Sequence, residues 1–282
     1  MKDMNEKNRQ KMKSYALRQD ILDIVYAGKT GHIGGDFSVI DILLALYNHM
    51  DITPENFESQ DRDHFVLSKG HCVEALYAVL ADKGFIRLKD VVATYSKFGS
   101  DYIGHPSNKI FGVEMNSGSL GHGLSVCVGM ALAGKRLGKT YRVYTVMGDG
   151  ELAEGSIWEA AMAASNFELD NLCAIVDRNH LQISGDTEEV MQQGDVAKRF
   201  ESFGWNTIEL EDGNDPEAIE RALQQAQACS GKPTLIVANT IKGYGAKIME
   251  AKAGWHHKVP NDEEYAQITA ELTARKEAIC HE

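Results

Sequence analysis

The segment VYTVMGDGELAEG (residues 143–155) decides how this chain of 282 residues is expected to fold. Five mostly apolar residues run directly into Gly148-Asp149-Gly150, which puts a carboxylate where a strand should end. Glycines at such a place allow a sharp turn and a close approach of the backbone to a ligand, while Asp149 presents a hard oxygen. Taken alone, the tripeptide fits an ordinary turn with a capping Asp equally well.

A second strand-like run, LCAIVDRNHLQISG, carries Asn179 at its end, 30 residues after Asp149. That spacing is about one strand–helix–strand unit, so the two strands are predicted to be neighbours. A carboxylate and a carboxamide side by side suit Mg²⁺, which takes a few protein ligands and completes its shell from phosphate and water. The pair therefore favours a metal site over a plain turn.

Short apolar runs alternate with longer segments at helical spacing along the chain. The runs, rich in β-branched residues, are HFVLS, RVYTVM, LCAIVD, NTIEL and TLIVANT. The segments predicted to be helical are residues 37–48, 71–83, 123–137, 156–168 and 215–229. This alternation predicts an α/β fold with a doubly wound, mainly parallel sheet flanked by helices, and ligands at the carboxyl ends of the strands.

No linker, repeat or low-complexity tract divides the sequence. Residues 1–282 are therefore predicted to form a single domain, with a helical arm at about 1–30 and a charged tail at about 261–282.

The net charge of −12 argues against nucleic acid or an anionic membrane as the main partner. The sequence contains no apolar run of 18 residues and no signal-peptide pattern. Its five cysteines are widely spaced and include no C-x-x-C, which favours free thiols in a reducing compartment. The predicted location is the cytoplasm.

Four of the ten histidines directly follow a glycine. They are in the pairs Gly31-His32, Gly70-His71, Gly104-His105 and Gly121-His122. Random placement would give about one such pair at this glycine content. Imidazoles on glycine turns can converge on one pocket and handle hydroxyls and protons near neutral pH, although a capping or surface role is commoner for any single histidine. A zinc cluster is less favoured, since neither H-E-x-x-H nor paired cysteines occur.

The segment NSGSLGHGLSVCVGMALAG (residues 116–134) places three glycines before an apolar helix, an arrangement suited to backbone N–H contacts with a ligand. It is neither the dinucleotide fingerprint nor a Walker P-loop.

Together these motifs resemble a known family. GDG with Asn179 resembles the thiamine-diphosphate signature, and the whole ordered set resembles transketolase. The set is GHIGG, DRDHFVLSKGH, IGHPS, SGSLGHGLSVCVGMALAGK, GDGELAEGSIWEAAMAASNFELDNLCAIVDRNHLQISG and GWHHKVPNDEEY. The match runs from about residue 10 to 270 and covers only the N-terminal, pyrophosphate-binding domain of that family. The resemblance is therefore closest to the N-terminal subunit of a split, two-chain transketolase.

The resemblance implies a site for thiamine diphosphate and Mg²⁺, with Ca²⁺ or Mn²⁺ able to substitute. Asp149 and Asn179 would ligate the metal by side chain and Leu181 by its carbonyl. The residues implied in cofactor binding are His71, Gly118, Ser119, Leu120, Gly150, Asn179 and Glu154. Glu154 matches a position linked in the family to communication across the dimer, but a helix-start carboxylate favoured by the macrodipole explains it equally well.

The resemblance also implies that His32, His105 and His256 face the sugar and act in catalysis. Two residues depart from the family pattern. His257 stands where Gly is usual, which leaves open whether His256 or its neighbour belongs to the site. His180 replaces a common Gly directly after the Asn ligand and could crowd the metal loop.

The activity implied is transfer of a two-carbon ketol unit from a ketose phosphate to an aldose phosphate. In this family the Glu beside the cofactor's pyrimidine and the phosphate-binding residues lie on the next domain. We therefore expect a separate C-terminal subunit to complete the site, an α2β2 assembly, and no activity from this chain alone, unless the sequence is a fragment of a longer enzyme.

Two other functions stay open on the sequence. The α subunit of a 2-oxoacid dehydrogenase would share GDG and the Asn but not GHIGG, SKGH and IGHPS. A noncatalytic, cofactor-binding paralogue would keep the fold alone. The sugar is not specified by the sequence: pentose phosphates are the default, and a dedicated catabolic route is the alternative.

Overall fold

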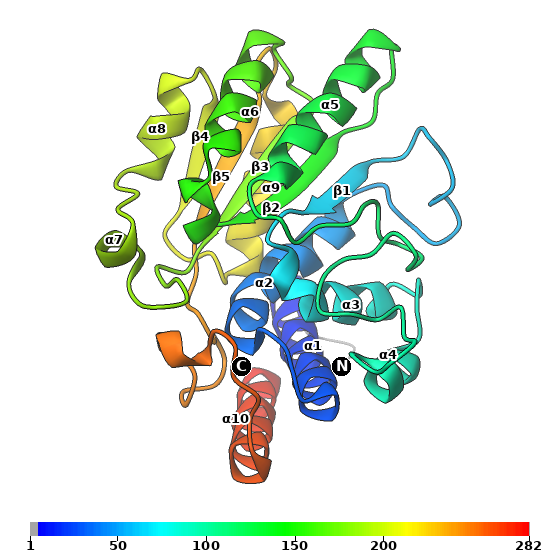
Figure 1. Cartoon of the computed structure of the whole chain (residues 1–282), viewed down its shortest axis with the longest axis vertical. Helices are drawn as coiled ribbons and strands as arrows, with labels where there is room; N and C mark the ends of the chain where they lie inside the picture. The colour runs from blue at the N-terminus through cyan, green and yellow to red at the C-terminus, as the bar shows by residue number, and fades with distance from the viewer. Residues whose placement is uncertain (1–4, 282) are drawn as a thin grey trace.

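The computed structural model describes residues 5–281, so the ends of the predicted arm and tail, residues 1–4 and 282, lie outside the described part. Five strands and ten α-helices make up this part of the chain (Figure 1). The strands are β1 (His64–Leu67), β2 (Val143–Gly148), β3 (Leu172–Arg178), β4 (Asn206–Leu210) and β5 (Thr234–Asn239). The helices are α1 (Glu6–Gly28), α2 (Ile33–His49), α3 (Val73–Asp82), α4 (Leu88–Thr94), α5 (His122–Arg136), α6 (Gly155–Asn166), α7 (Thr187–Val190), α8 (Val196–Ser202), α9 (Pro216–Ala228) and α10 (Asp262–Cys280). Short 3₁₀ turns occur at η1 (Gly70–Cys72), η2 (Gly150–Ala153) and η3 (Ala253–Trp255).

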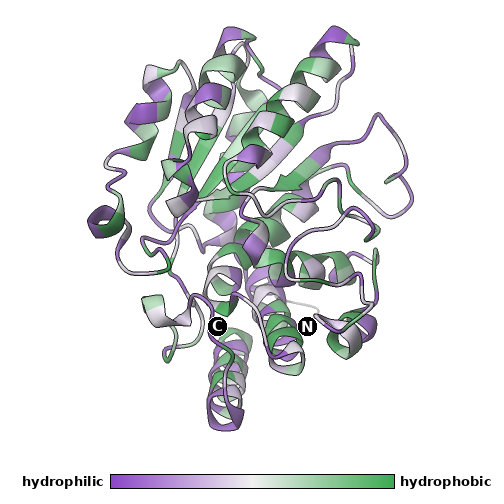
Figure 2. Ribbon diagram, in the orientation of Figure 1, coloured by the Kyte–Doolittle hydropathy of each residue, from purple (hydrophilic) through white to green (hydrophobic). Residues whose placement is uncertain are grey.

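The strands form one parallel sheet in the order β1-β2-β3-β5-β4. Each strand overlaps one of the five apolar runs that predicted it. Strand β2 is buried along its whole length, as expected of a parallel strand that is covered on both faces. Two apolar cores lie on opposite faces: helices α5, α6 and α8 cover one, and α1, α2, α3 and α9 contribute to the other. Figure 2 shows the apolar strands between the helices. The predicted doubly wound α/β fold is confirmed.

The predicted helices differ from the observed ones mainly at their starts. Helix α2 begins at Ile33, four residues before the predicted start, because the GHIGG segment already forms its first turn. The predicted helix 71–83 begins as the 3₁₀ turn η1 and continues as α3. Both changes move a histidine onto a helix start at the edge of the sheet.

The segment predicted as a helical arm contains helix α1, which is part of the core. Helix α1 packs against α2, α3 and α10, and it buries Ile21, Leu22 and Val25 completely. The C-terminal helix α10 lies along α1 and starts with a capping box at Asn261 and Glu264.

The order of strands brings the two metal-ligand candidates to one edge. Strands β2 and β3 are direct neighbours, and Gly148 is in register with Asp177. Asp149 and Asn179 therefore follow adjacent strands at their carboxyl ends, as the spacing predicted. Within residues 5–281, no helix is both long enough and apolar enough to cross a membrane.

Candidate active site

A cavity of about 340 Å³ opens at the carboxyl edge of the sheet. Ten of the predicted site residues line it: His32, His71, His105, Gly118, Leu120, Asp149, Gly150, Asn179, Leu181 and His256. Ser119 and Glu154 do not line the cavity, and both are exposed. A more open depression of about 700 Å³ lies beside α4 around Phe98, and none of the predicted residues line it.

The three oxygen-bearing ligand candidates belong to one loop network. Asp149 accepts hydrogen bonds from the backbone N–H groups of Gly150 and His180, both at 2.8 Å, and from Thr187 Oγ1 at 3.1 Å. Asn179 Oδ1 accepts from the N–H of Leu181 at 3.2 Å. Burial raises the pKa of the Asp149 carboxyl, and nearby Asp177 adds to the effect. A carboxylate held this way gains from a cation beside it.

His180 lies in the metal loop with a left-handed backbone, φ 63°. Its side chain is exposed, so it does not fill the loop, and its backbone N–H holds Asp149. The expected crowding is therefore replaced by backbone strain, since residues other than glycine adopt this conformation at a cost.

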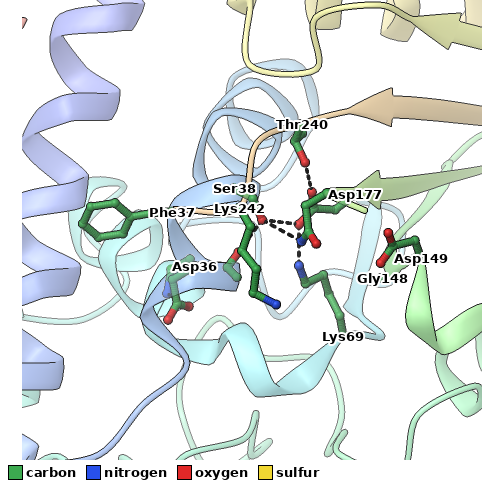
Figure 3. A network of polar contacts seen from close by, with 12 residues as sticks. Asp36, Phe37, Ser38, Lys69, Gly148, Asp149, Asp177, Thr240 and Lys242 are labelled. Atoms are coloured by element: carbon green, nitrogen blue, oxygen red, sulfur yellow. Dashed lines mark hydrogen bonds and ion pairs between the residues drawn. The ribbon is translucent and has the colours of Figure 1, made fainter. Parts of the chain in front are cut away.

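Behind the cavity, the sequence analysis missed a buried charged network centred on Asp177 (Figure 3). The Asp177 carboxylate accepts from Ser38 Oγ at 2.7 Å, from Thr240 Oγ1 and from Lys69 Nζ. Burial disfavours the charged ammonium of Lys69, but the Asp177 carboxylate outweighs this and raises the pKa of Lys69. Lys69 is thus a buried, permanently charged group, and it also lines the cavity.

Lys242 is a second buried lysine in the cavity wall. Its Nζ donates to the carbonyl of Leu181 at 3.2 Å and lies 2.9 Å from His256 Nδ1. Burial, helped by the charge of Lys69, lowers the pKa of Lys242 to about 8. Two ammonium groups in one wall make the cavity suited to an anion.

Each missed residue carried a signal in the sequence. Asp177 ends the apolar run LCAIVD, Lys242 follows TLIVANT, and Lys69 directly precedes a Gly-His pair. A charge at the end of a buried strand points to the ligand edge of a parallel sheet.

The histidines converge, as the recurrence of Gly-His predicted. The ring centroid of His32 lies 5.2 Å from that of His71, 6.4 Å from His105 and 5.4 Å from His256. The centroids of His71 and His256 are 5.4 Å apart. His257 packs against His32 at 4.6 Å, but only His256 lines the cavity. His122 is exposed and lies outside the cavity lining.

These imidazoles are held in the neutral form. Burial, followed by His257 and His105, lowers the pKa of His32 to about 4. Burial and the Lys242 charge lower that of His256 to about 3, and burial lowers those of His71 and His105. Neutral imidazoles can accept a proton or a hydroxyl hydrogen bond, which suits handling of a polyhydroxy substrate.

The glycine turn before α5 closes against the same cavity. Gly118 has φ 148°, and a Cβ there would come within 2.9 Å of His105. The buried Glu151 carboxylate accepts from the N–H groups of Gly121 at 2.7 Å and Gly148 at 3.1 Å, which fastens this turn to the end of β2. The turn is therefore positioned by the strand that carries Asp149.

The pair of lysines and the glycine turn make this cavity suited to an anion, and a comparison with protein families shows which family the chain belongs to. Residues 9–278 match "Transketolase, thiamine diphosphate binding domain". The chain belongs to the transketolase family.

Among curated transketolase relatives, the chain is 48% identical over 263 residues to an apulose-4-phosphate transketolase subunit of Phocaeicola vulgatus, covering 93% of each chain. It is 41% identical over 244 residues to the "6-deoxy-6-sulfo-D-fructose transketolase subunit SqwG" of a Clostridium species, covering 86% of this chain and 88% of that protein. Human transketolase is 41% identical over 245 residues, and the match covers only 38% of that longer protein.

Solved transketolases have the same fold. The Pichia stipitis transketolase in complex with sedoheptulose-7-phosphate superposes with a TM-score of 0.88 at 30% identity. The superposition covers 98% of this chain and 44% of that one, so the chain spans less than half the length of the solved enzymes. It holds the thiamine diphosphate binding domain of this transferase family, and the match decides against a 2-oxoacid dehydrogenase α subunit.

Proposed function

We propose that this chain is the cofactor-binding subunit of a two-chain transketolase that moves a two-carbon ketol unit from a ketose phosphate to an aldose phosphate. The observation that carries the proposal is a single cavity that is lined by candidate ligand oxygens, two lysines and neutral histidines. The relatives that it matches over most of their length are themselves named as transketolase subunits, which supports a separate second chain.

Thiamine diphosphate, when bound, supplies an electron sink for breaking the bond next to the ketone. Asp149, Asn179 and the Leu181 carbonyl would hold Mg²⁺, with Ca²⁺ or Mn²⁺ as substitutes. One carboxylate, one carboxamide and one carbonyl are hard oxygen donors of the kind Mg²⁺ takes alongside phosphate oxygens.

The remaining wall is assigned to the diphosphate and the thiazolium ring. Gly150 and the Gly118–Leu120 turn, with Ser119, offer backbone N–H groups, while His71 and Lys69 lie beside them. Lys69 adds a charge that Asp177 holds in place. Glu154 is assigned to contact across a subunit interface, which agrees with its exposure.

His32, His105 and His256 are assigned to the sugar. In the neutral form each can accept a hydrogen bond from a sugar hydroxyl, and one can take the proton of the hydroxyl next to the bond that breaks. His256 is preferred over His257 because it lines the cavity and contacts Lys242.

The partner is a C-terminal transketolase subunit that supplies the Glu beside the pyrimidine and the phosphate-binding residues. Two copies of each chain form the proposed α2β2 assembly, with residues 1–282 as one cofactor-binding domain and the cytoplasm as the proposed location. The sugar is a ketose phosphate or a close analogue, since the relatives are named for apulose 4-phosphate and 6-deoxy-6-sulfo-D-fructose.

Two-carbon transfer to an aldose phosphate acceptor tests the proposal. The donors are apulose 4-phosphate, 6-deoxy-6-sulfofructose and xylulose 5-phosphate, each offered to the chain alone and to the chain with a C-terminal subunit. Turnover only in the mixture is expected, with light scattering giving the mass of two chains of each kind. Turnover by the chain alone contradicts the two-chain proposal, and cofactor binding without turnover of any donor favours a noncatalytic paralogue.

The metal assignment is tested by titrating thiamine diphosphate and Mg²⁺ into Asp149→Asn with the partner present. Asp61→Asn is the matched control, because Asp61 makes an exposed ion pair with Lys139 away from the cavity lining. Loss of an ionic metal ligand is expected to weaken cofactor binding at least tenfold, about 1.4 kcal/mol. Equal affinity in Asp149→Asn and the control refutes the assignment.

A further inference from the structure

Two carboxyl groups are completely buried beside the histidine cluster, outside the cavity lining. Asp36 is in the first turn of α2, and Glu74 is in the first turn of α3. Asp36 Oδ1 accepts from the backbone N–H of Ala75 at 3.0 Å, and Glu74 Oε1 accepts from Tyr95 OH at 2.5 Å. The remaining oxygens, Asp36 Oδ2 and Glu74 Oε2, are buried and without a hydrogen-bond partner in residues 5–281. Figure 3 shows Asp36 to one side of the Asp177 network and not joined to it.

Two orphaned oxygens on facing acids are explained if one proton lies between them. Two ionised carboxylates buried together repel each other, whereas one proton makes one group the donor and the other the acceptor. Neither carboxyl group forms an ion pair in the described part of the chain. Both lie in the first turn of a helix, where the one remaining negative charge of the pair is favoured.

The groups facing the pair agree with this charge state. Lys69 is the cation that acts on Asp36, but its Nζ is bonded to Asp177. Cys72, Tyr77 and Tyr95 face the pair as neutral groups, because burial raises the pKa of each. His32, whose turn lies next to Glu74, is itself held neutral. Burial raises the pKa of Asp36 well above its usual range and that of Glu74 to about 7.

The pair and Tyr95 underlie the glycine turns that carry histidines. A Cβ on Gly31 would come within 2.5 Å of Glu74 Oε1, so this backbone rests directly on the carboxyl group. A Cβ on Gly104 would lie 3.5 Å from the Tyr95 hydroxyl. Glu74 itself follows His71 by three residues, in the first turn of α3, which directly continues turn η1. The three turns therefore present His32, His71 and His105 from one buried support.

We propose that Asp36 and Glu74 share one proton and, with Tyr95, form a positioning triad that fixes the three histidine turns. These are positioning residues, since they lie behind the cavity and act through the histidines. The part that concerns catalysis rests on the proposed function; the shared proton and its effect on the turns do not.

The proposal predicts how stability varies with pH. The folded pKa of Glu74, about 7, is above its unfolded value, and that of Asp36 is also raised. The contribution of Glu74 is therefore fully present below about pH 4.5 and is lost as the pH rises through about 7. Glu74→Gln keeps an N–H donor to Asp36 and an oxygen for Tyr95 without a titrating proton. It should fold with near wild-type stability at pH 6 and lose less stability between pH 6 and 8.

The decisive readout is the histidine ring NMR signals of the chain by itself, recorded from pH 5 to 8. In the wild type, the His32 and His105 signals should shift as Glu74 titrates, near its pKa of about 7, although the pKa values of their own rings are lowered. Glu74→Gln should abolish this shift. Asp20→Asn is the matched control, because burial and Asp23 raise the pKa of Asp20 to about 6 on α1, away from the histidine turns.

With the partner subunit present, Glu74→Ala should raise KM for the ketose at least tenfold and change the affinity for thiamine diphosphate less than twofold, while Glu74→Gln restores KM. Histidine signals that do not respond to the pair, or Glu74→Gln as damaging as Glu74→Ala, overturn the proposal. Signals that follow the pair in a chain without transferase activity support the triad and count against the proposed function.

Discussion

Two buried ion pairs differ in how completely they are satisfied. Arg18, between α1 and α2, contacts Asp41 at 2.6 Å and also donates to the carbonyls of Phe37 and Tyr244, both at 2.8 Å, and to Ser14 Oγ. Lys69 is equally buried, but Asp177 is the one hydrogen-bond partner of its Nζ in residues 5–281. The first pair has no donor left, whereas the second keeps N–H groups for a ligand in the cavity that Lys69 lines.

The difference separates framework from site. A fully hydrogen-bonded ion pair holds three segments together, because Arg18 reaches helix α2 and the loop after β5. The Lys69–Asp177 pair, at the carboxyl edge of the sheet, leaves N–H groups of the Lys69 ammonium free to bind an anion. Of these two ion pairs, the saturated one is structural, and the one with spare hydrogen-bonding capacity lies at the cavity.

The largest effect is expected from breaking the framework pair. Asp41→Ala leaves the Arg18 guanidinium buried without its anion and should lower the free energy of unfolding by about 3–5 kcal/mol in urea titrations. The matched control is Asp82→Ala, which removes the exposed partner of Lys13 and should cost about 0–1 kcal/mol. The folded fraction of Asp41→Ala should bind thiamine diphosphate with wild-type affinity. Weakened binding would contradict the assignment of the Arg18–Asp41 pair to the framework alone.

The site pair should respond in binding as well as in stability. Lys69→Met removes the proposed charge-assisted hydrogen bond to the diphosphate, about 1.5–3 kcal/mol, which corresponds to an affinity loss of roughly 10–150-fold. Calorimetric titration with the partner and Mg²⁺ measures it, at a temperature where the variant is folded. An affinity within twofold of wild type would show that Lys69 is framework like Arg18.

The neutral histidines should make the site sensitive to acid. The folded pKa of His32, about 4, is below its unfolded value of about 6.5, so stability is lost as the pH falls from about 6.5 to 4. His32→Asn should reduce that loss of stability by about 1–2 kcal/mol. This is less than the full pKa shift would give, because the ring is partly exposed and solvent screens its charge. The checking measurement is urea unfolding at pH 6.5 and 4.5, with the exposed His122→Asn as control. An equal acid dependence in both variants would contradict it.

The smallest effect concerns backbone strain. His180→Gly relieves a left-handed conformation beside Asp149 and should raise the free energy of unfolding by about 1 kcal/mol or less, since glycine also loses more entropy on folding. Lys29→Gly, at another left-handed position after α1, should give a similar gain away from the site. Metal affinity should stay within twofold in both variants, because the His180 side chain is exposed. A gain in the free energy of unfolding that occurs only in His180→Gly would mean that the site imposes the strain.

Much of the architecture could be predicted from local pattern. Apolar runs located all five strands, and the spacing from Asp149 to Asn179 identified two neighbouring ones, because a crossover unit has a narrow range of lengths. The start of α2 was predicted too late because the glycines at 34 and 35 look like a loop in the sequence. They are glycines because tertiary packing leaves no room for side chains: a Cβ on Gly34 would lie 2.6 Å from the Trp255 carbonyl oxygen. The packing of α1 into the core was missed for a similar reason, since its apolar residues follow only a weak pattern.

By itself, the sequence determined which side chains stand at the ends of strands and at glycine turns, and hence the oxygen ligands and the histidines. Only the tertiary structure decided which of them meet. It brought Lys69 and Lys242 to one wall, moved Ser119 and Glu154 outside the cavity, and set Asp36 against Glu74. The physical reason is that chain periodicity fixes the direction of a residue relative to its own element, while burial, charge pairing and pKa depend on neighbours supplied by distant segments.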